Sequence, residues 1–179
     1  QLCAQDNMIV AMPSNPASYF HLLRLQANAL VQRPLVVFTP KSLLRAKHAV
    51  SRKSDFTSGY FHPMLPDTEY PNGGMRKVLL CAGKVYYDLL AHREENNITD
   101  VAIVRVERLY PLPARSLPPT IAGYPDAEVM WVQEEPMNQG AWSFMAMHLP
   151  QLIDRPVTAV ARPASSSPAV GAHHRHDAE

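Results

Sequence analysis

The chain has 179 residues, of which 46% are hydrophobic, so it is long and apolar enough to bury the core of one domain or of one and a half. Its formal net charge is +1 and it lacks an apolar run of about 18 residues, so composition indicates no nucleic-acid partner and no membrane span. The cysteines, Cys3 and Cys81, lie in different segments without CxxC spacing, which favours buried reduced thiols over a disulfide. We expect a piece of a longer polypeptide. The chain starts at Gln1 and not at Met, without a signal or transit segment, and it ends at Glu179 without a helix-ending signal.

The first predicted elements form a strand–helix–strand unit. Residues 8–12 are an apolar, strand-like run. Asn15 is suited to cap the following helix, and Pro16 fits its first position, where no amide donor is needed. The β-branched run 35–40 is typical of a buried parallel strand, so the unit has the length of a right-handed crossover. The apolar residues that share one face of the predicted helix are Phe20, Leu23, Ala27 and Leu30.

Residues 41–75 have a different character, with three prolines, a Gly-Gly pair, scattered charges and little periodicity. This composition predicts a long connection that lies over the surface. Structureless loops of this length are uncommon inside a compact domain, so the segment also indicates a domain boundary.

A second alternation of strands and helices begins at Lys77. It indicates an α/β fold, with a mostly parallel open sheet and helices on both faces. Strands are predicted over 77–83, from 100 toward the prolines near 113, over 127–135 and over 157–163, and helices over 84–97, 139–153 and, weakened by two prolines, 114–123. The predicted inner face of the first of these helices consists of Val85, Tyr86, Leu89 and Leu90.

In open parallel sheets, ligands gather at the carboxyl ends of the strands. Gly83 and Lys84 follow one such strand, but the full phosphate-loop spacing GxxxxGK[ST] is absent, which favours a tight turn that needs Gly83 over a phosphate site. Arg108 and Arg115 flank another strand end, where guanidinium groups can bind a phosphate or carboxylate. A solvated surface with salt bridges is the commoner role for arginines in such a place.

The histidines near the carboxyl terminus resemble metal ligands only in residue type. His173, His174 and His176 lack the helical i, i+4 pairing and the second ligand set that a zinc site uses. We therefore predict a polar tail over 173–179.

The most informative stretch is 131–142, WVQEEPMNQGAW. Its adjacent glutamates lie on a predicted strand and point to opposite faces, so they are no paired-carboxylate acid/base device. The amide pair is suited to cap the next helix, and a buried Trp often anchors an interface. An interface or cleft rim and a simple turn remain as alternatives. The candidate interface residues are Glu134, Glu135, Asn138, Gln139 and Trp142.

Several strings together resemble the carboxyl-terminal part of the thiamine-diphosphate-dependent 2-oxoglutarate dehydrogenase family, which has a transketolase-like fold. In order, they are QLCAQDNMIVAMPSNPASYFHLLRLQ, RPLVVFTPKSLLR, GKVYYDLL, DVAIVRVERLYPLP, WVQEEPMNQGAW and RPASSSPAVG. The resemblance covers about residues 1–172. It implies that 1–40 end a pyrimidine-binding domain, 41–75 connect, 76–172 form a transketolase-like carboxyl-terminal domain and 173–179 a polar tail.

The resemblance also implies an activity for the complete enzyme. Such an enzyme uses thiamine diphosphate and Mg²⁺, decarboxylates 2-oxoglutarate in the tricarboxylic acid cycle and succinylates the lipoyl group of its dihydrolipoyl succinyltransferase partner. It is a homodimer of the bacterial cytoplasm or the mitochondrial matrix. The diphosphate-binding GDG…N motif and the catalytic Glu are absent here, and His21 is expected to be a packing or surface group on its helix. The fragment alone is therefore expected to be inactive, with no catalytic residue.

Some members of the family bind a nucleotide or acyl-CoA effector near this region. The candidate effector-binding residues here are Arg33, Arg108 and Arg115. The match is partial, because Leu25 stands where many relatives have a second Arg of the helix, and Arg108 where many have Gln. The alternatives to a fragment of the dehydrogenase are a stand-alone nucleotide or acyl-CoA binding module and a purely structural docking domain.

Overall fold

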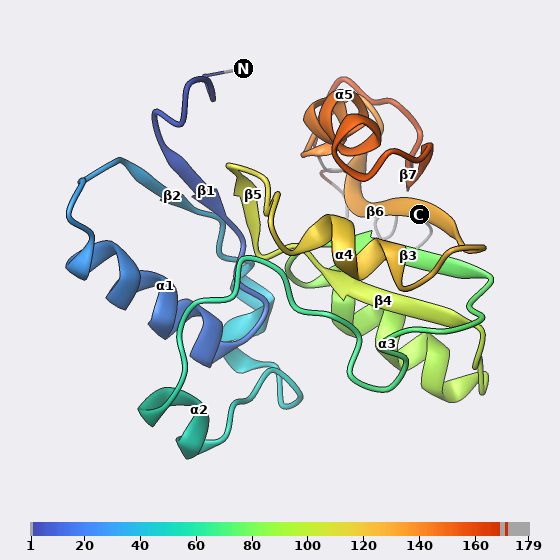
Figure 1. Cartoon of the computed structure of the whole chain (residues 1–179), viewed down its shortest axis with the longest axis horizontal. Helices are drawn as coiled ribbons and strands as arrows, with labels where there is room; N and C mark the ends of the chain where they lie inside the picture. Colours follow the sequence, from blue (N-terminus) through green and yellow to red (C-terminus); the bar gives the residue numbers. More distant parts are fainter. Residues whose placement is uncertain (1, 169–170, 172–179) are drawn as a thin grey trace.

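The structure is a computed structural model that describes residues 2–168 and 171. It contains two sheets, joined side by side, with helices packed on both (Figure 1). In chain order the elements are β1 (Ile9–Ala11), α1 (Pro16–Asn28), β2 (Leu35–Val37), the 3-10 helix η1 (Lys41–Arg45), α2 (Lys53–Thr57), β3 (Lys77–Cys81), α3 (Val85–Glu95), β4 (Val101–Arg105), β5 (Arg108–Tyr110), α4 (Leu117–Ala122), β6 (Glu128–Pro136), α5 (Trp142–Ile153) and β7 (Val157–Arg162).

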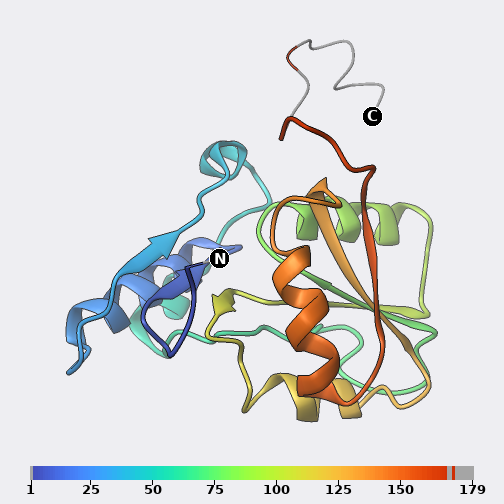
Figure 2. The same ribbon diagram turned by 90° about the horizontal axis from the view of Figure 1, so that it is seen from above.

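The larger sheet has four parallel strands in the order β4-β3-β6-β7. Its central strand β3 is nearly continuous in apolar residues, as a strand covered on both faces requires. Helix α3 covers one face, and α4 and α5 cover the other (Figures 1 and 2). The predicted α/β fold with a mostly parallel open sheet and helices on both faces is confirmed.

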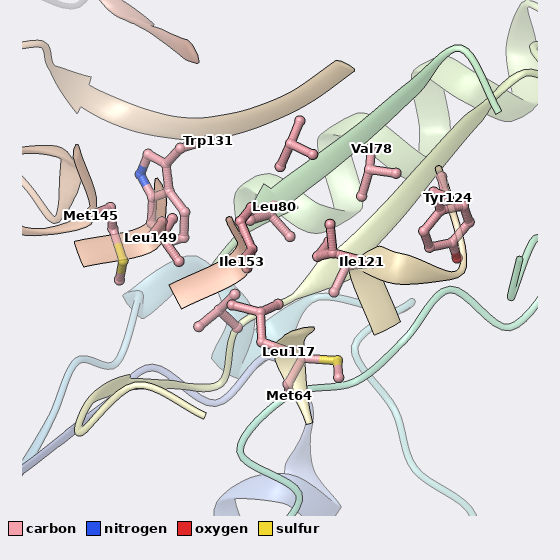
Figure 3. Close-up of a cluster of buried hydrophobic side chains, with 14 of the residues drawn as sticks. Met64, Val78, Leu80, Leu117, Ile121, Tyr124, Trp131, Met145, Leu149 and Ile153 are labelled. Carbon is pink, nitrogen blue, oxygen red and sulfur yellow. The ribbon is translucent and has the colours of Figure 1, made fainter. Parts of the chain in front are cut away.

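The main core lies between this sheet and the helices α4 and α5. Trp131 on β6 packs beside Met145 and Leu149 of α5, and Ile121 of α4 lies close by (Figure 3). All four side chains are at most 1% exposed. Apolar residues at spacings of three and four along α5 face the sheet, which explains why this helix forms over the predicted region.

The smaller sheet has the order β2-β1-β5. Strands β1 and β2 are parallel and are joined by α1, as the sequence predicted. Strand β5 pairs with β1 antiparallel, with Ala11 opposite Arg108. The segment 100–113 was expected to open with one strand and end at prolines, so the sequence missed β5, which leaves the large sheet and joins the small one.

Helix α1 begins as expected but buries another face. The Asn15 side chain accepts a hydrogen bond of 2.8 Å from the Ser18 amide, and Pro16 occupies the first turn. The predicted apolar stripe is exposed: Phe20 is 42% and Leu23 45% exposed. The buried residues of the helix are Ala17, Ser18, His21 and Leu22, two of which are polar and have hydrogen-bond partners.

The connection 41–75 is more structured than the expected surface loop. It contains η1 and α2, and it buries Phe61, Met64 and Asp67. Leu65 forms an isolated antiparallel bridge to Arg105 at the end of β4. The segment therefore lies against both sheets instead of running only over the surface.

Both cysteines are free thiols in the structure. Cys81 is buried, and burial raises the pKa of its thiol to about 12, so the thiol stays protonated. Cys3 is only partly buried, which differs from the expectation of two buried thiols. None of the described helices is long and apolar enough to cross a membrane.

Candidate functional site

The turn from β6 to α5, the stretch singled out in the sequence, is organised by Gln133. The Gln133 side-chain oxygen accepts hydrogen bonds from the Trp131 indole at 3.0 Å and from the Trp142 amide at 2.9 Å. Its side-chain nitrogen donates to the Gln139 carbonyl at 2.8 Å. Gln133 is 7% exposed and thus caps α5 from inside the fold.

The expected capping role of the amide pair is wrong. Asn138 and Gln139 both donate to the Ser165 carbonyl at 2.9 Å, and the Ser165 amide donates to Asn138 at 3.0 Å. Their side chains therefore tie the turn to the segment after β7. Helix α5 instead begins after Ala141, which makes no side-chain capping bond.

The two glutamates of the turn do not form an acid/base pair. The Glu134 carboxylate accepts from the Lys84 ammonium at 2.7 Å, and Lys84 also pairs with Asp88 at 2.9 Å. Burial alone would lower the pKa of Lys84, but these two carboxylates outweigh it and raise that pKa. Lys84 is therefore a cation already held by two partners. Gly83, at φ +66°, makes the predicted tight turn before it.

The three candidate effector arginines occupy separate positions. Arg33 is exposed just before β2, and Arg108 lies on β5, on the other side of β1. The Arg108 guanidinium donates to the Pro111 carbonyl at 2.8 Å, and burial lowers the pKa of Arg108. Arg115 is exposed just before α4. Effector binding by this set stays a prediction.

Sequence reasoning missed the buried cation Arg93. Its guanidinium pairs with the buried carboxylate of Asp67 and, at 3.1 Å, with Glu69. Arg93 follows Tyr86 and Leu89 at helical spacing, so the periodic face of α3 pointed to its burial. His21 is buried too, and its ring nitrogen Nε2 lies 2.7 Å from the Asp55 carbonyl, which confirms the packing role expected for it.

Sequence reasoning also missed a buried carboxylate between the sheets. Glu107 lies between β4 and β5 and is 0% exposed. Its oxygens accept hydrogen bonds from Ser14 and Ser18, at the start of α1. Burial raises the pKa of Glu107, and these hydrogen bonds and the charge of Arg105 oppose that rise. No local sequence pattern predicts this role. Glu107 follows β4 of the four-stranded sheet, whereas Ser14 and Ser18 belong to a distant segment of the chain.

A cavity of about 490 Å³ opens at the carboxyl ends of β1 and β2. Its lining is mostly proline, alanine and leucine, with Ser14 and Asn15 at the start of α1 and Arg45 of η1. The lining includes no carboxylate. Parallel strands commonly present ligands at this edge, so the cavity is the candidate ligand site of the smaller sheet.

The described residues do not fit a Mg²⁺ site. Among them no group of three or more His, Cys, Asp or Glu side chains is placed to hold a metal ion. Carboxylate and carbonyl oxygens are the usual Mg²⁺ ligands, and the cavity lining offers no carboxylate. The histidines 173, 174 and 176 lie outside the described residues.

Comparison with known proteins decides the family. The model of the family described as 2-oxoglutarate dehydrogenase C-terminal matches residues 50–179. The chain belongs to this family. The resemblance drawn from the sequence is thereby confirmed, and the alternative of a stand-alone nucleotide or acyl-CoA module is not favoured.

Individual members of the 2-oxoglutarate dehydrogenase family are similar in sequence to this chain over nearly its whole length. It is 45% identical to the 2-oxoglutarate dehydrogenase E1 component of Cupriavidus necator, over 99% of this chain and 19% of that protein. It is 46% identical over its full length to the 2-oxoglutarate dehydrogenase E1/E2 component of Corynebacterium glutamicum, and 45% identical to the multifunctional 2-oxoglutarate metabolism enzyme of Mycobacterium sp. strain JLS. The chain spans 15% of each of these two proteins.

Proposed function

We propose that this chain is the carboxyl-terminal part of a 2-oxoglutarate dehydrogenase, which oxidatively decarboxylates 2-oxoglutarate in the tricarboxylic acid cycle. The observation that carries the proposal is the 45% identity to an E1 component over 99% of the chain. The family match over residues 50–179 supports it independently of the first strand–helix–strand unit.

Within that enzyme, the chain supplies scaffold instead of chemistry. Two carboxylates beside the strand ends are engaged in structural contacts, Glu134 with Lys84 and Glu107 with Ser14. Among the described residues no group of three metal-ligating side chains is placed for Mg²⁺, which supports the proposal that thiamine diphosphate and Mg²⁺ are held by other parts of the complete enzyme. We assign no catalytic residue to it.

The same proposal includes the domain division and the partners. Residues 1–40 end a pyrimidine-binding domain, 41–75 connect, and 76–172 form the carboxyl-terminal domain. The complete enzyme is a homodimer that passes a succinyl group to the lipoyl arm of a dihydrolipoyl succinyltransferase. Its place is the cytoplasm of a bacterium or the mitochondrial matrix of a eukaryote. Arg33, Arg108 and Arg115 remain its candidate effector-binding residues.

The proposal is tested by decarboxylation of 2-oxoglutarate with thiamine diphosphate and Mg²⁺ present. The complete polypeptide that contains this chain should turn over 2-oxoglutarate, whereas the 179-residue chain should not. Turnover by the 179-residue chain alone would contradict the scaffold role. A complete polypeptide that decarboxylates pyruvate in preference to 2-oxoglutarate would contradict the substrate.

The β6–α5 turn is proposed to support an interdomain or subunit interface. Trp142 is only partly buried, although it packs against the main core, so part of its indole is available to another surface. Trp142→Ala should weaken dimerisation of the complete enzyme about tenfold, since a truncated Trp anchor typically costs more than 1 kcal/mol. Sedimentation of the dimer measures this. Ser143→Ala, at an exposed neighbour, is the control, and an unchanged dimer in Trp142→Ala would refute the interface.

A further inference from the structure

Ser14, which follows β1, lies where the two sheets adjoin, and residues of β4, α3 and the segment between β4 and β5 engage all of its polar atoms. The Ser14 amide donates to Glu107 at 2.8 Å, and its hydroxyl donates to the other Glu107 oxygen at 2.5 Å. The hydroxyl also accepts from the Arg105 guanidinium at 3.0 Å. The Ser14 carbonyl accepts from the Tyr87 hydroxyl at 2.8 Å. Ser14 is 1% exposed, so no water competes for these bonds.

Glu107 is surrounded by donors. Besides the two bonds from Ser14, the Ser18 hydroxyl donates to Oε2 at 2.6 Å. A carboxylate accepts hydrogen bonds through both oxygens, whereas its protonated form must donate one. The Ser14 amide can only donate, whereas each serine hydroxyl can donate to a carboxylate or accept from a protonated carboxyl group, so the three contacts fit either protonation state of Glu107. The backbone reinforces the contact, because the Met12 amide donates to the Glu107 carbonyl at 2.8 Å.

Arg105 extends this hydrogen-bond network without touching Glu107. It reaches the carboxylate through the Ser14 hydroxyl, which accepts from Arg105 and donates to Glu107. The guanidinium lies 4.2 Å from the centre of the Tyr86 ring, a cation–π contact on α3. Arg105 is also fixed through its backbone, which exchanges two 2.9 Å hydrogen bonds with Leu65. The hydrogen-bond network thus spans β4, α3 and the start of α1.

From this arrangement we propose that Glu107 is a positioning residue, a buried hydrogen-bonded clasp that fixes the start of α1, through Ser14 and Ser18, against the four-stranded sheet. The clasp sets how the β1–α1–β2 unit sits on the carboxyl-terminal unit. The hydrogen bonds to Glu107 are directional and desolvated, so they restrict the arrangement of the two units more than apolar packing alone would. The inference concerns the arrangement of the two units and stands apart from the proposed catalytic activity.

Amide hydrogen exchange of the complete enzyme tests the clasp, since it reports local opening directly. In Glu107→Gln the amide group has one acceptor oxygen in place of two, so at least one of the three donors loses its partner. Exchange of peptides within 9–28 should rise at least tenfold, while peptides of β3 and β6 keep their protection. Ser14→Ala should act on the same peptides, and Ser18→Ala should raise their exchange about threefold.

A double variant and a matched control separate positioning from general destabilisation. Ser14→Ala combined with Glu107→Gln should open residues 9–28 little more than Glu107→Gln alone, because both changes remove the same bond. Ser116→Ala is the control, since the buried Ser116 hydroxyl has no hydrogen-bond partner among the described residues.

The proposal is overturned if exchange within 9–28 stays at the wild-type level in Ser14→Ala and Ser18→Ala. It is equally overturned if exchange rises by the same factor in β3 and β6, which would make Glu107 a general core residue. If Glu107→Gln fails to fold, the two serine variants decide the question alone. Loss of turnover with unchanged exchange would bear on the proposed activity and would contradict the clasp.

Discussion

At the scale of single residues, Gln133 determines the β6–α5 turn more than the charged residues beside it. Its side chain bonds two tryptophans and the turn backbone, whereas Glu134 is exposed and salt-bridged. The sequence drew attention to the glutamates because carboxylates are common catalytic groups. A buried amide produces no periodic signal, so its role is visible only when the turn is folded.

Gln133→Ala should lower the free energy of unfolding by about 2 to 4 kcal/mol, because it leaves the buried Trp131 indole without its acceptor. The α5 terminus loses its bond to the Trp142 amide as well. Urea denaturation of the purified chain measures the change. Gln151→Ala, at an exposed position of α5, should stay within about 0.5 kcal/mol of wild type. Equal effects of the two variants would show that the Gln133 bonds carry no net stability.

Asp67 makes the free energy of unfolding depend on pH in the acid range. Burial alone would raise its pKa, but hydrogen bonds from the amide of Ile103 and from Arg93, with those from Tyr70 and Glu69, outweigh burial and lower the pKa. A carboxyl group whose pKa is lower in the folded state stabilises the fold above its unfolded pKa of about 3.9. That stabilisation is lost as the pH falls through the folded value.

Asp67→Asn should therefore destabilise the chain by about 3 kcal/mol at pH 7, since it leaves the half-exposed Glu69 as the one carboxylate paired with the buried Arg93 among the described residues. The difference from wild type should start to shrink near the unfolded pKa of about 3.9, where the unfolded chain takes up a proton, and should continue to shrink as the pH falls through the lower folded pKa. Unfolding by urea across this pH range gives the profile. The exposed Asp126→Asn should follow wild type at each pH, and a gap between Asp67→Asn and wild type that stays constant into acid would contradict the assignment.

At the scale of elements, the sequence predicted the strands and helices whose apolar pattern is local and strong. The runs at β3, β4 and β6 are nearly continuous in apolar residues and appear where expected. Strand β5 has three residues, and its pairing partner β1 lies about a hundred positions earlier, so no local pattern announces it. Helix α1 was predicted, but its buried face was not, because polar partners from distant segments decide it.

The turn from β3 to α3 depends on Gly83 for two reasons. Its φ of +66° is costly for residues with a Cβ, and an added Cβ would lie 2.5 Å from Cε of Met12. Gly83→Ala should cost about 1 to 2 kcal/mol in thermal unfolding, with Met12 moving aside to relieve the contact. Gly74→Ala is the matched control, because an added Cβ there has no atom within 4 Å and its φ is not positive. A neutral Gly83→Ala would refute the need for glycine.

At the scale of the whole molecule, the smaller sheet leaves apolar surface uncovered. Strand β2 is an edge strand, and Phe38 just beyond it is 52% exposed. On α1, Phe20 and Leu23 are more than two-fifths exposed, and Leu30 beyond the helix is fully so. Exposed apolar faces of this kind mark contact surfaces. The sequence placed Phe20 and Leu23 on one face of the helix, whereas Leu30 lies beyond its end. A periodic pattern cannot say whether such a face meets the same chain or another.

The curated relatives are more than five times longer, because the chain spans 19% of the first of them, and in such a protein other parts would cover this face. In the 179-residue chain the face is uncovered, so the chain should associate with itself. Leu23→Glu places a charge on the exposed stripe without touching the core, and it should reduce the concentration-dependent mass measured by light scattering. Met147→Glu is the control, because Met147 is 59% exposed on α5, on the other sheet. In the complete enzyme the same Leu23→Glu should instead impair folding or assembly, because the charge would then lie in a covered interface. A monomeric wild-type chain, together with a fully assembled Leu23→Glu enzyme, would show that the stripe is ordinary solvent-exposed surface.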